Sequence, residues 1–318
     1  MTTSRPARAI TATGLRKAYG EQVVLDGIDL DIPEGTVFSL LGPNGAGKTT
    51  VVQILSTLIR ADGGEFRVAG HDPAKEPDAV RAAIGVTGQF SAVDDLLTGE
   101  ENLLLMAELH HLGRREGRRR AAELLERFDL AGAARKTPAT YSGGMRRRLD
   151  IAMTLVGEPR VIFLDEPTTG LDPRSRHTMW QIVRDLVAGG VTVFLTTQYL
   201  EEADELADRI AVLNGGKLVA EGTAEELKRR IPGGHVRLRF TRPEDLERAA
   251  APPAASPPGP PPGPPPGPPA GSPAHSARPA SACASAPAWS PARACRALAA
   301  ARRSTAELST RSSGRARR

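Results

Sequence analysis

Residues 40–50 read LLGPNGAGKTT, a glycine-rich run that ends in a lysine and two threonines. Its glycines let backbone N–H groups turn toward an anion, and a helix that begins near Lys48 adds positive potential at its N-terminus. The spacing fits the phosphate-loop pattern, in which Lys48 reaches the β- and γ-phosphates of a nucleotide and the Thr49 hydroxyl ligates Mg²⁺. An apolar strand precedes the loop and a helix-like segment follows it. We therefore predict a nucleotide site here.

Short apolar strands alternate with helix-like segments between residue 8 and about residue 230. Strand-like runs occupy 36–42, 160–166 and 191–197, and residues 173–188 have a helical pattern. This alternation predicts an α/β fold with a mostly parallel central sheet, formed by a domain at 1–230.

A helical subdomain is expected at about 90–157, inserted between two strands of that sheet. Thr98 is a favourable helix cap with Glu101 three residues later, and a second helical stretch covers about 114–129.

The end of the chain differs in composition from the rest. Residues 231–248 give one alternating strand and the start of a helix, which we interpret as an incomplete accessory α/β unit. Residues 249–318 hold 16 of the 27 prolines, both cysteines (Cys283 and Cys295) and little apolar surface. This low-complexity tail is expected to be disordered.

Charge and hydropathy exclude several classes of protein. The tail has nine arginines, no lysine and one glutamate, so its net charge is +8. The whole chain has a net charge of +5, and the first 248 residues therefore carry −3. We therefore expect no nucleic-acid partner, although the whole chain is basic. No run reaches the roughly 18 apolar residues of a membrane span, and no apolar segment follows Met1 as in a secretory signal, so a cytosolic location is expected.

Two further motifs carry chemistry. In VIFLDEP the apolar residues place Asp165 and Glu166 at the carboxyl end of a buried strand, where ligands bind in open α/β sheets. There Asp165 would hold the Mg²⁺ shell and Glu166 would polarise an attacking water; a solvated acidic turn is the alternative. In TYSGGMRRRLDIAM, Ser142 is a natural helix cap, and Gly143 and Gly144 expose backbone donors at the positive helix end. That is a second anion site.

Together these motifs resemble the ATP-binding cassette (ABC) family over about residues 8–230. The resemblance implies a head-to-tail homodimer, in which each ATP lies between the loop of one protomer and the Ser142–Gly144 segment of the other. It implies ATP and Mg²⁺ as ligands, an integral-membrane permease as partner, and a peripheral position on the cytoplasmic face of the membrane. The loop residues carried over as nucleotide-binding are Gly42, Pro43, Asn44, Gly45, Ala46, Gly47, Lys48, Thr49 and Thr50.

Other positions match the family one by one. Tyr19 matches the aromatic residue that stacks on adenine, Gln89 the glutamine that contacts Mg²⁺ and senses the membrane partner, and Asp172 a loop at the dimer interface. The alternatives are a surface tyrosine, a solvated loop glutamine and a cap for the helix that Pro173 opens. The arginine runs Arg118–Arg120 and Arg146–Arg148 are interpreted as solvated helix faces rather than a nucleic-acid surface.

Residues 84–103, 141–156 and 195–210 resemble the daunorubicin-resistance branch of drug exporters. That branch commonly has glutamine where most cassettes have histidine, so Gln198 is expected to sense the γ-phosphate, with catalytic roles for Lys48 and Glu166. Capping of the helix that begins at Tyr199 is the alternative. The branch implies ATP-driven export of hydrophobic antibiotics. Members of that branch normally complete a small α/β unit after the position of residues 235–248, whereas this chain continues with the low-complexity tail. The tail is therefore either a genuine extension or an out-of-frame reading of a GC-rich gene.

Three other functions stay open. The chain could be a soluble cassette ATPase that acts on ribosomes or nucleic acid, a subunit for another substrate such as a lipid or polysaccharide, or a proline-rich interaction protein with a silent ATPase core. The intact Lys48 and Glu166 argue against the last of these.

Overall fold

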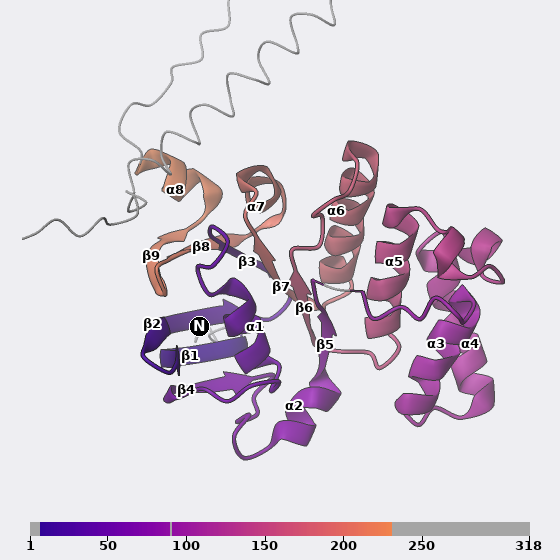
Figure 1. Cartoon of the computed structure of the whole chain (residues 1–318), viewed down its shortest axis with the longest axis horizontal. Coiled ribbons are helices and arrows are strands. Elements are labelled where there is room, and N and C mark those ends of the chain that lie inside the picture. The colour runs from indigo at the N-terminus through magenta and orange to yellow at the C-terminus, as the bar shows by residue number, and fades with distance from the viewer. Residues whose placement is uncertain (1–6, 90, 231–318) are drawn as a thin grey trace, which may run out of the picture. The chain divides into compact units, whose positions relative to one another are not determined.

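Short, fully buried strands form the middle of the larger sheet. The computed structural model describes residues 7–89 and 91–230. Its six-stranded sheet has the order β5-β6-β7-β3-β8-β9, in which only β9 runs antiparallel (Figure 1). The strands are β3 (Val37–Leu41), β5 (Ile84–Thr87), β6 (Val161–Asp165), β7 (Thr192–Thr197), β8 (Arg209–Asn214) and β9 (Lys217–Gly222). The predicted mostly parallel sheet is confirmed.

Alternate side chains of these strands enter two different cores, one on each face of the sheet. On one face Phe194 lies between Phe38 and Phe163, with ring centroids 5.5 Å apart in both pairs, and helix α1 (Lys48–Leu55) packs there. On the other face the side chains of strands β6 and β7 pack against helix α6 (Pro173–Ala188). A strand covered on both sides is apolar throughout, which explains why these runs lack a polar alternation.

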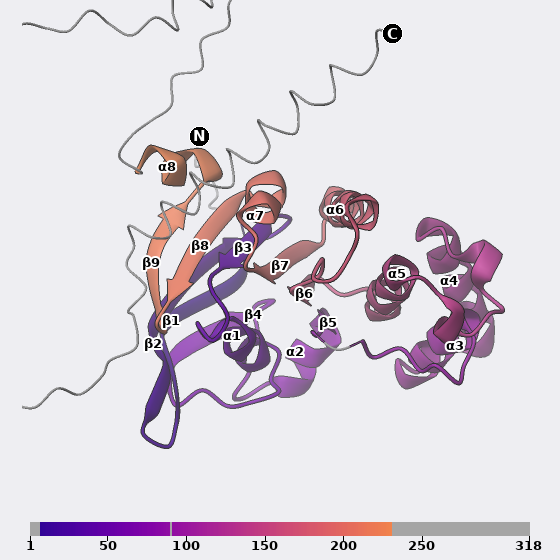
Figure 2. The ribbon, with the colours of Figure 1, turned by 45° about the horizontal axis from the view of Figure 1, so that its top comes forward.

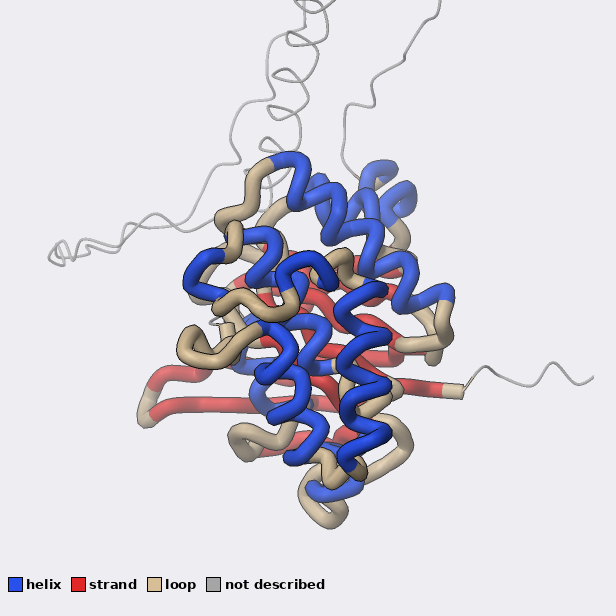
Figure 3. The backbone as a smooth tube through the Cα atoms, turned by 90° about the vertical axis from the view of Figure 1, so that its right-hand side faces the viewer, coloured by secondary structure: helices blue, strands red, loops and turns tan. Residues whose placement is uncertain are grey.

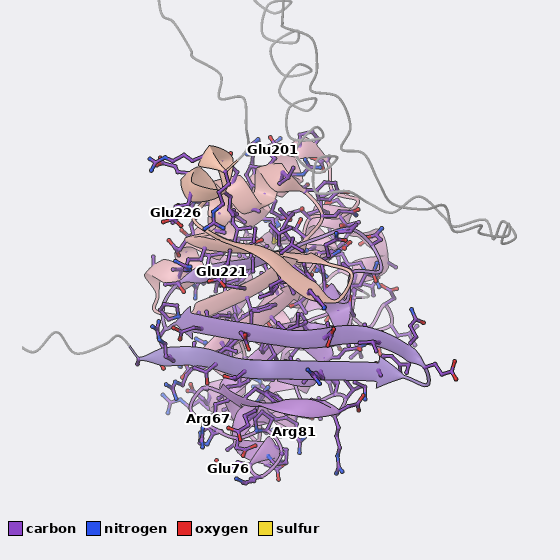
Figure 4. All side chains as sticks on the ribbon, turned by 90° about the vertical axis from the view of Figure 1, so that its left-hand side faces the viewer. Arg67, Glu76, Arg81, Glu201, Glu221 and Glu226 are labelled. Carbon is purple, nitrogen blue, oxygen red and sulfur yellow. The ribbon has the colours of Figure 1, made fainter. Side chains whose placement is uncertain are left out.

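A second, antiparallel sheet of order β2-β1-β4 covers helix α1 (Figure 2). It consists of β1 (Arg8–Tyr19), β2 (Gln22–Pro33) and β4 (Gly63–Val68). This sheet was not predicted, because β1 and β2 are joined by a tight turn at Gly20 (φ 60°) rather than by a helix. Figure 4 views the molecule from this side, where the labelled Glu221 of β9 pairs with Arg209 of β8 at 2.9 Å.

The helical subdomain is inserted in the chain between β5 and β6. In the view of Figure 3, helices lie in front of the strands. Its helices are α3 (Gly99–Leu109), α4 (Arg114–Arg127) and α5 (Gly143–Thr154), with single 3₁₀ turns at Ala131–Ala133 and Pro138–Thr140. Thr98 and Glu101 form the expected capping box, with reciprocal bonds of 3.2 and 2.7 Å. Buried leucines of all three helices join the core under α6, so the subdomain is packed onto the sheet and not merely tethered to it.

Three short helices complete the described part of the chain: α2 (Pro77–Ala83), α7 (Leu200–Leu206) and α8 (Ala224–Arg229). Within residues 7–89 and 91–230, none of the helices combines the length and the apolar character that crossing a bilayer requires. The accessory unit expected at 231–248 and the tail expected at 249–318 lie outside the described residues.

Candidate nucleotide site

The loop between β3 and α1 has a backbone that only glycine tolerates at two positions. Gly47 adopts φ 106°, and a Cβ there would lie 2.8 Å from the Leu25 side chain. A Cβ on Gly42 would lie 2.4 Å from the carbonyl oxygen of Leu213. Asn44 and Gly45 are exposed at the loop tip, and helix α1 begins directly after the loop, at Lys48. The loop is therefore an exposed turn whose backbone leads into a helix N-terminus, the geometry that binds phosphate.

Lys48 is folded into this loop. Its ammonium donates to the carbonyl oxygens of Gly42 at 2.9 Å and Pro43 at 3.1 Å, and lies 3.2 Å from Glu166 Oε1. Only 5% of its side chain is exposed. A buried cation held next to a glycine-rich loop is a ready partner for a phosphate anion.

Asp165 connects the loop to the sheet. One of its carboxylate oxygens accepts a 2.8 Å hydrogen bond from Thr49 Oγ1, and the other accepts one from the Thr196 hydroxyl of the neighbouring strand. Asp165 as a whole is 2% exposed. A hydroxyl and a carboxylate side by side are the hard oxygen donors that Mg²⁺ prefers, so Thr49 and Asp165 fit the ion.

Glu166 has a strained backbone. Its φ of 48° is unusual for a residue with a side chain, and its N–H donates to both the carbonyl and the hydroxyl oxygen of Thr196, at 3.1 Å each. Thr169 Oγ1 donates to the carboxylate at 3.3 Å. Strain maintained by such bonds is typical of functional sites, and here it turns the Glu166 carboxylate toward Lys48.

Gln89 and Gln198 follow the carboxyl ends of β5 and β7, at the same edge of the sheet as the loop. Gln89 is exposed and Gln198 is partly buried. The alternative that Gln198 caps the next helix is wrong, because Tyr199 is the N-cap residue and α7 begins at Leu200. Tyr19 is 51% exposed at the end of β1, with the Lys17 ammonium 5.3 Å from its ring centroid. Its contact with adenine stays a prediction.

Ser142, Gly143 and Gly144 begin helix α5, as the sequence predicts. Ser142 is the N-cap residue and its Oγ accepts a 3.2 Å bond from the N–H of Met145. Helix α5 lies on the other side of β6 from helix α1 (Figures 1 and 2). The two predicted anion sites of one chain thus belong to helices that β6 separates.

Asp172 lies beside the Ser142–Gly144 segment. It caps α6 by accepting from the N–H of Ser175 at 3.0 Å and from the Ser175 hydroxyl at 2.6 Å, and this hydroxyl bond lowers the pKa of Asp172. A Cβ on Gly144 would lie 2.5 Å from Ser175 Oγ. The cap role is therefore confirmed, and it places Asp172 close to the start of α5.

The interpretation of the arginine runs as solvated faces is wrong for three side chains. Arg119 is solvated (60% exposed), but the side chains of Arg120, Arg147 and Arg148 are 12%, 11% and 16% exposed. Their guanidinium groups donate to carbonyl oxygens of other segments, and such contacts leave no trace in the helical period. Sequence reasoning also missed Thr196, although its place at the end of β7 was a signal.

Comparisons with known proteins agree with this geometry. The family model described as ABC transporter matches residues 25–169. The daunorubicin resistance ATP-binding protein DrrA3 of Streptomyces coeruleorubidus is 60% identical over 228 residues, covering 72% of this chain and 72% of that protein. The daunorubicin/doxorubicin resistance ATP-binding protein DrrA of Streptomyces peucetius is 55% identical over 237 residues, covering 74% and 72%.

Among solved structures, an ATP-binding subunit of an ABC transporter matches with a TM-score of 0.63 at 29% identity. The match covers 70% of this chain and 92% of that one. The phosphate loop, the acidic strand end and these relatives agree, and the chain belongs to the ABC transporter family as an ATP-binding subunit.

Proposed function

We propose that this chain hydrolyses ATP to drive the export of hydrophobic drugs through a separate membrane permease. The observation that carries the proposal is that Lys48, Asp165 and Glu166 lie together at one edge of the sheet. Lys48 contacts Glu166 at 3.2 Å and the loop carbonyl of Gly42 at 2.9 Å, and Asp165 accepts a 2.8 Å bond from Thr49. ATP binding and ATPase activity are properties of the family. The roles of single residues, the Mg²⁺ site, the dimer, the permease and the drug are our proposals.

The residues divide the chemistry between them. Lys48 neutralises the β- and γ-phosphates, and the loop N–H groups orient them. Glu166 accepts a proton from the attacking water, and its backbone bonds to Thr196 fix the direction from which it does so. Thr49, Asp165 and Gln89 would hold Mg²⁺, which neutralises charge that develops on the phosphates. Gln198 donates its amide to the γ-phosphate, and Tyr19 stacks on the base.

A homodimer completes the site. The separation of α5 from α1 by strand β6 supports a shared arrangement, in which Ser142, Gly143 and Gly144 of one protomer serve the ATP held by the other. Asp172 lies next to that segment through Ser175, which supports its place at the same interface.

The drug and the location are inferred from relatives. DrrA3 of Streptomyces coeruleorubidus is named for daunorubicin resistance, and DrrA of Streptomyces peucetius for daunorubicin/doxorubicin resistance. We infer an anthracycline-like hydrophobic substrate, a permease that supplies the membrane spans, and a peripheral position at the cytoplasmic face of the membrane.

One variant tests the central role. Glu166→Gln should bind ATP with nearly parental affinity and hydrolyse it at least about 100-fold more slowly, because the amide cannot accept the proton. Lys48→Ala is the companion variant and should lose nucleotide binding instead. Parental turnover by the Glu166→Gln protein would refute the role of Glu166.

The transport role needs a cellular assay. Cells that express the chain with its permease should accumulate less daunorubicin than cells that express the Glu166→Gln chain with the same permease. Equal accumulation in the two kinds of cell, with ATPase activity intact, would refute daunorubicin as the exported substrate. It would not affect the assignment of ATPase activity.

A further inference from the structure

Arg147, in the first turns of helix α5, donates to three carbonyl oxygens in two other chain segments. Its guanidinium lies 2.9 Å from the carbonyl oxygen of Gly88, 3.2 Å from that of Asp165 and 3.1 Å from that of Pro167. A fourth bond, of 3.1 Å, reaches the carboxylate of Asp150 one turn further along α5. One side chain of the Ser142 helix thus holds peptide groups at the ends of both β5 and β6.

Asp150 extends this set of contacts. Its second carboxylate oxygen accepts a 3.0 Å bond from the N–H of Ala92, and only 2% of its side chain is exposed. Burial raises the pKa of Asp150 and lowers that of Arg147, while their mutual attraction opposes both shifts. Burying this pair costs free energy. Apart from the bond between them, the two side chains bond to the chain around Gly88 and Ala92 and around Asp165 and Pro167.

The positions of these acceptors and donors are specific. Gly88 precedes Gln89 and Ala92 follows it, so the pair bonds to the chain on both sides of Gln89. We call the chain around this glutamine the Gln89 loop. Asp165 and Pro167 precede and follow Glu166, so the same guanidinium brackets the proposed base.

We propose that the Arg147–Asp150 pair is a positioning device that couples the Ser142 helix to the Gln89 loop and to Glu166. The proposal rests on the catalytic role of Glu166 argued above. A shift of α5 displaces the guanidinium, and the guanidinium carries the peptide groups on both sides of Glu166 with it. The start of α5, the Gln89 loop and Glu166 therefore move together within one protomer.

The chemistry of arginine supports a positioning role rather than a contribution to stability alone. A lysine cannot donate in several directions from one rigid plane, whereas the guanidinium fork can. Buried ion pairs add little net stability compared with apolar side chains of similar volume, so stability alone does not account for this pair. Its bonds to the peptide groups around two site residues do account for it.

The test compares two neighbouring arginines of the same helix. Arg147→Met removes the four bonds that the guanidinium donates, and leaves the bond from Ala92 to Asp150 in place. Arg148→Met removes a neighbouring arginine that is also mostly buried (16% exposed, against 11% for Arg147) and whose bonds go to Phe128 and Asp129, within the helical subdomain. For the full-length chain with Mg-ATP, kcat, the KM for ATP, the affinity for a fluorescent ATP analogue and the melting temperature are measured.

Arg147→Met should lower kcat by about 10- to 100-fold, the usual effect of a misplaced catalytic group, and change KM and analogue affinity by less than about threefold. Arg148→Met should melt at a similarly lowered temperature but keep kcat within about twofold. Arg147→Lys, which keeps the charge and is the safer variant to fold, should fall between the parent and Arg147→Met.

Two results would overturn the proposal. One is a parental kcat in Arg147→Met or in Arg147→Lys at a temperature where the protein is folded. The other is an equal loss of kcat in Arg148→Met, which would mean that loosening the subdomain is sufficient. Failure of the parent chain to hydrolyse ATP would count against the proposed function instead.

Discussion

Thr196 offers a sharp test of how the sheet supports the site. Its hydroxyl is fully buried, donates to one oxygen of Asp165 and accepts from the N–H of Glu166. Thr196→Val replaces the hydroxyl by a methyl group of similar volume, so the change removes two hydrogen bonds without opening a cavity. Asp165 keeps its bond from Thr49, and the Glu166 N–H keeps its bond to the Thr196 carbonyl.

The expected loss of stability follows from these contacts. One buried carboxylate oxygen loses its donor, which costs about 1–3 kcal/mol, while the N–H remains satisfied and adds little. A loss of about 2 kcal/mol lowers the melting temperature of a domain of this size by about 4–8 °C. The expected effect on Mg²⁺ affinity is larger than this effect on stability. Groups that orient a metal ligand typically contribute about 10- to 100-fold in metal affinity or activity.

The assay is ATPase rate against free Mg²⁺ concentration, for Thr196→Val and for Thr196→Ser as the matched control. The valine variant should need about 10- to 100-fold more Mg²⁺ for half-maximal rate, and the serine variant should resemble the parent because it keeps the hydroxyl. A valine variant with the parental Mg²⁺ requirement would show that Thr196 does not orient Asp165, and the assignment of Asp165 to the ion would lose its support.

A mixture of Lys48→Ala and Ser142→Arg chains can assemble one intact composite site, so it should recover part of the ATPase activity that each variant lacks alone. No recovery in proven mixed dimers would contradict the shared site. Gln198→Ala should lower turnover by about one to two orders of magnitude, the effect of losing a bond of about 1.5–3 kcal/mol, and Gln198→His should stay active with a new pH dependence near neutrality. ATPase rates between about pH 6 and 7.5 check this, and parental turnover in Gln198→Ala rules out the γ-phosphate contact. Burial raises the pKa of Glu202 (1% exposed), so its contribution to stability is full below about pH 4.5 and falls as pH rises toward the raised pKa. Glu202→Gln should flatten this slope in urea unfolding above about pH 4.5, and an unchanged slope would contradict the prediction.

The features that could be predicted from the residues alone are those that are local in the chain. The glycines at 42 and 47, the apolar run that ends at Asp165 and the cap at Ser142 are each specified by a few adjacent residues. A glycine-only backbone, a strand buried on both faces and a helix N-cap each have a recognisable residue pattern, because the physical constraint acts within one segment.

Contacts between distant segments could not be predicted in this way, because they depend on how the whole chain packs. Thr196 reaches Asp165 because β7 lies beside β6 in register, and strand order has no signature within either strand. Arg147 reads as one of three arginines on a helix, yet its guanidinium is buried against Gly88 and Pro167 while Arg119 is solvated. The helical period gives the direction in which a side chain leaves its helix. Whether the charged group is solvated or donates to carbonyl oxygens of another segment depends on which segments the fold packs against that helix face.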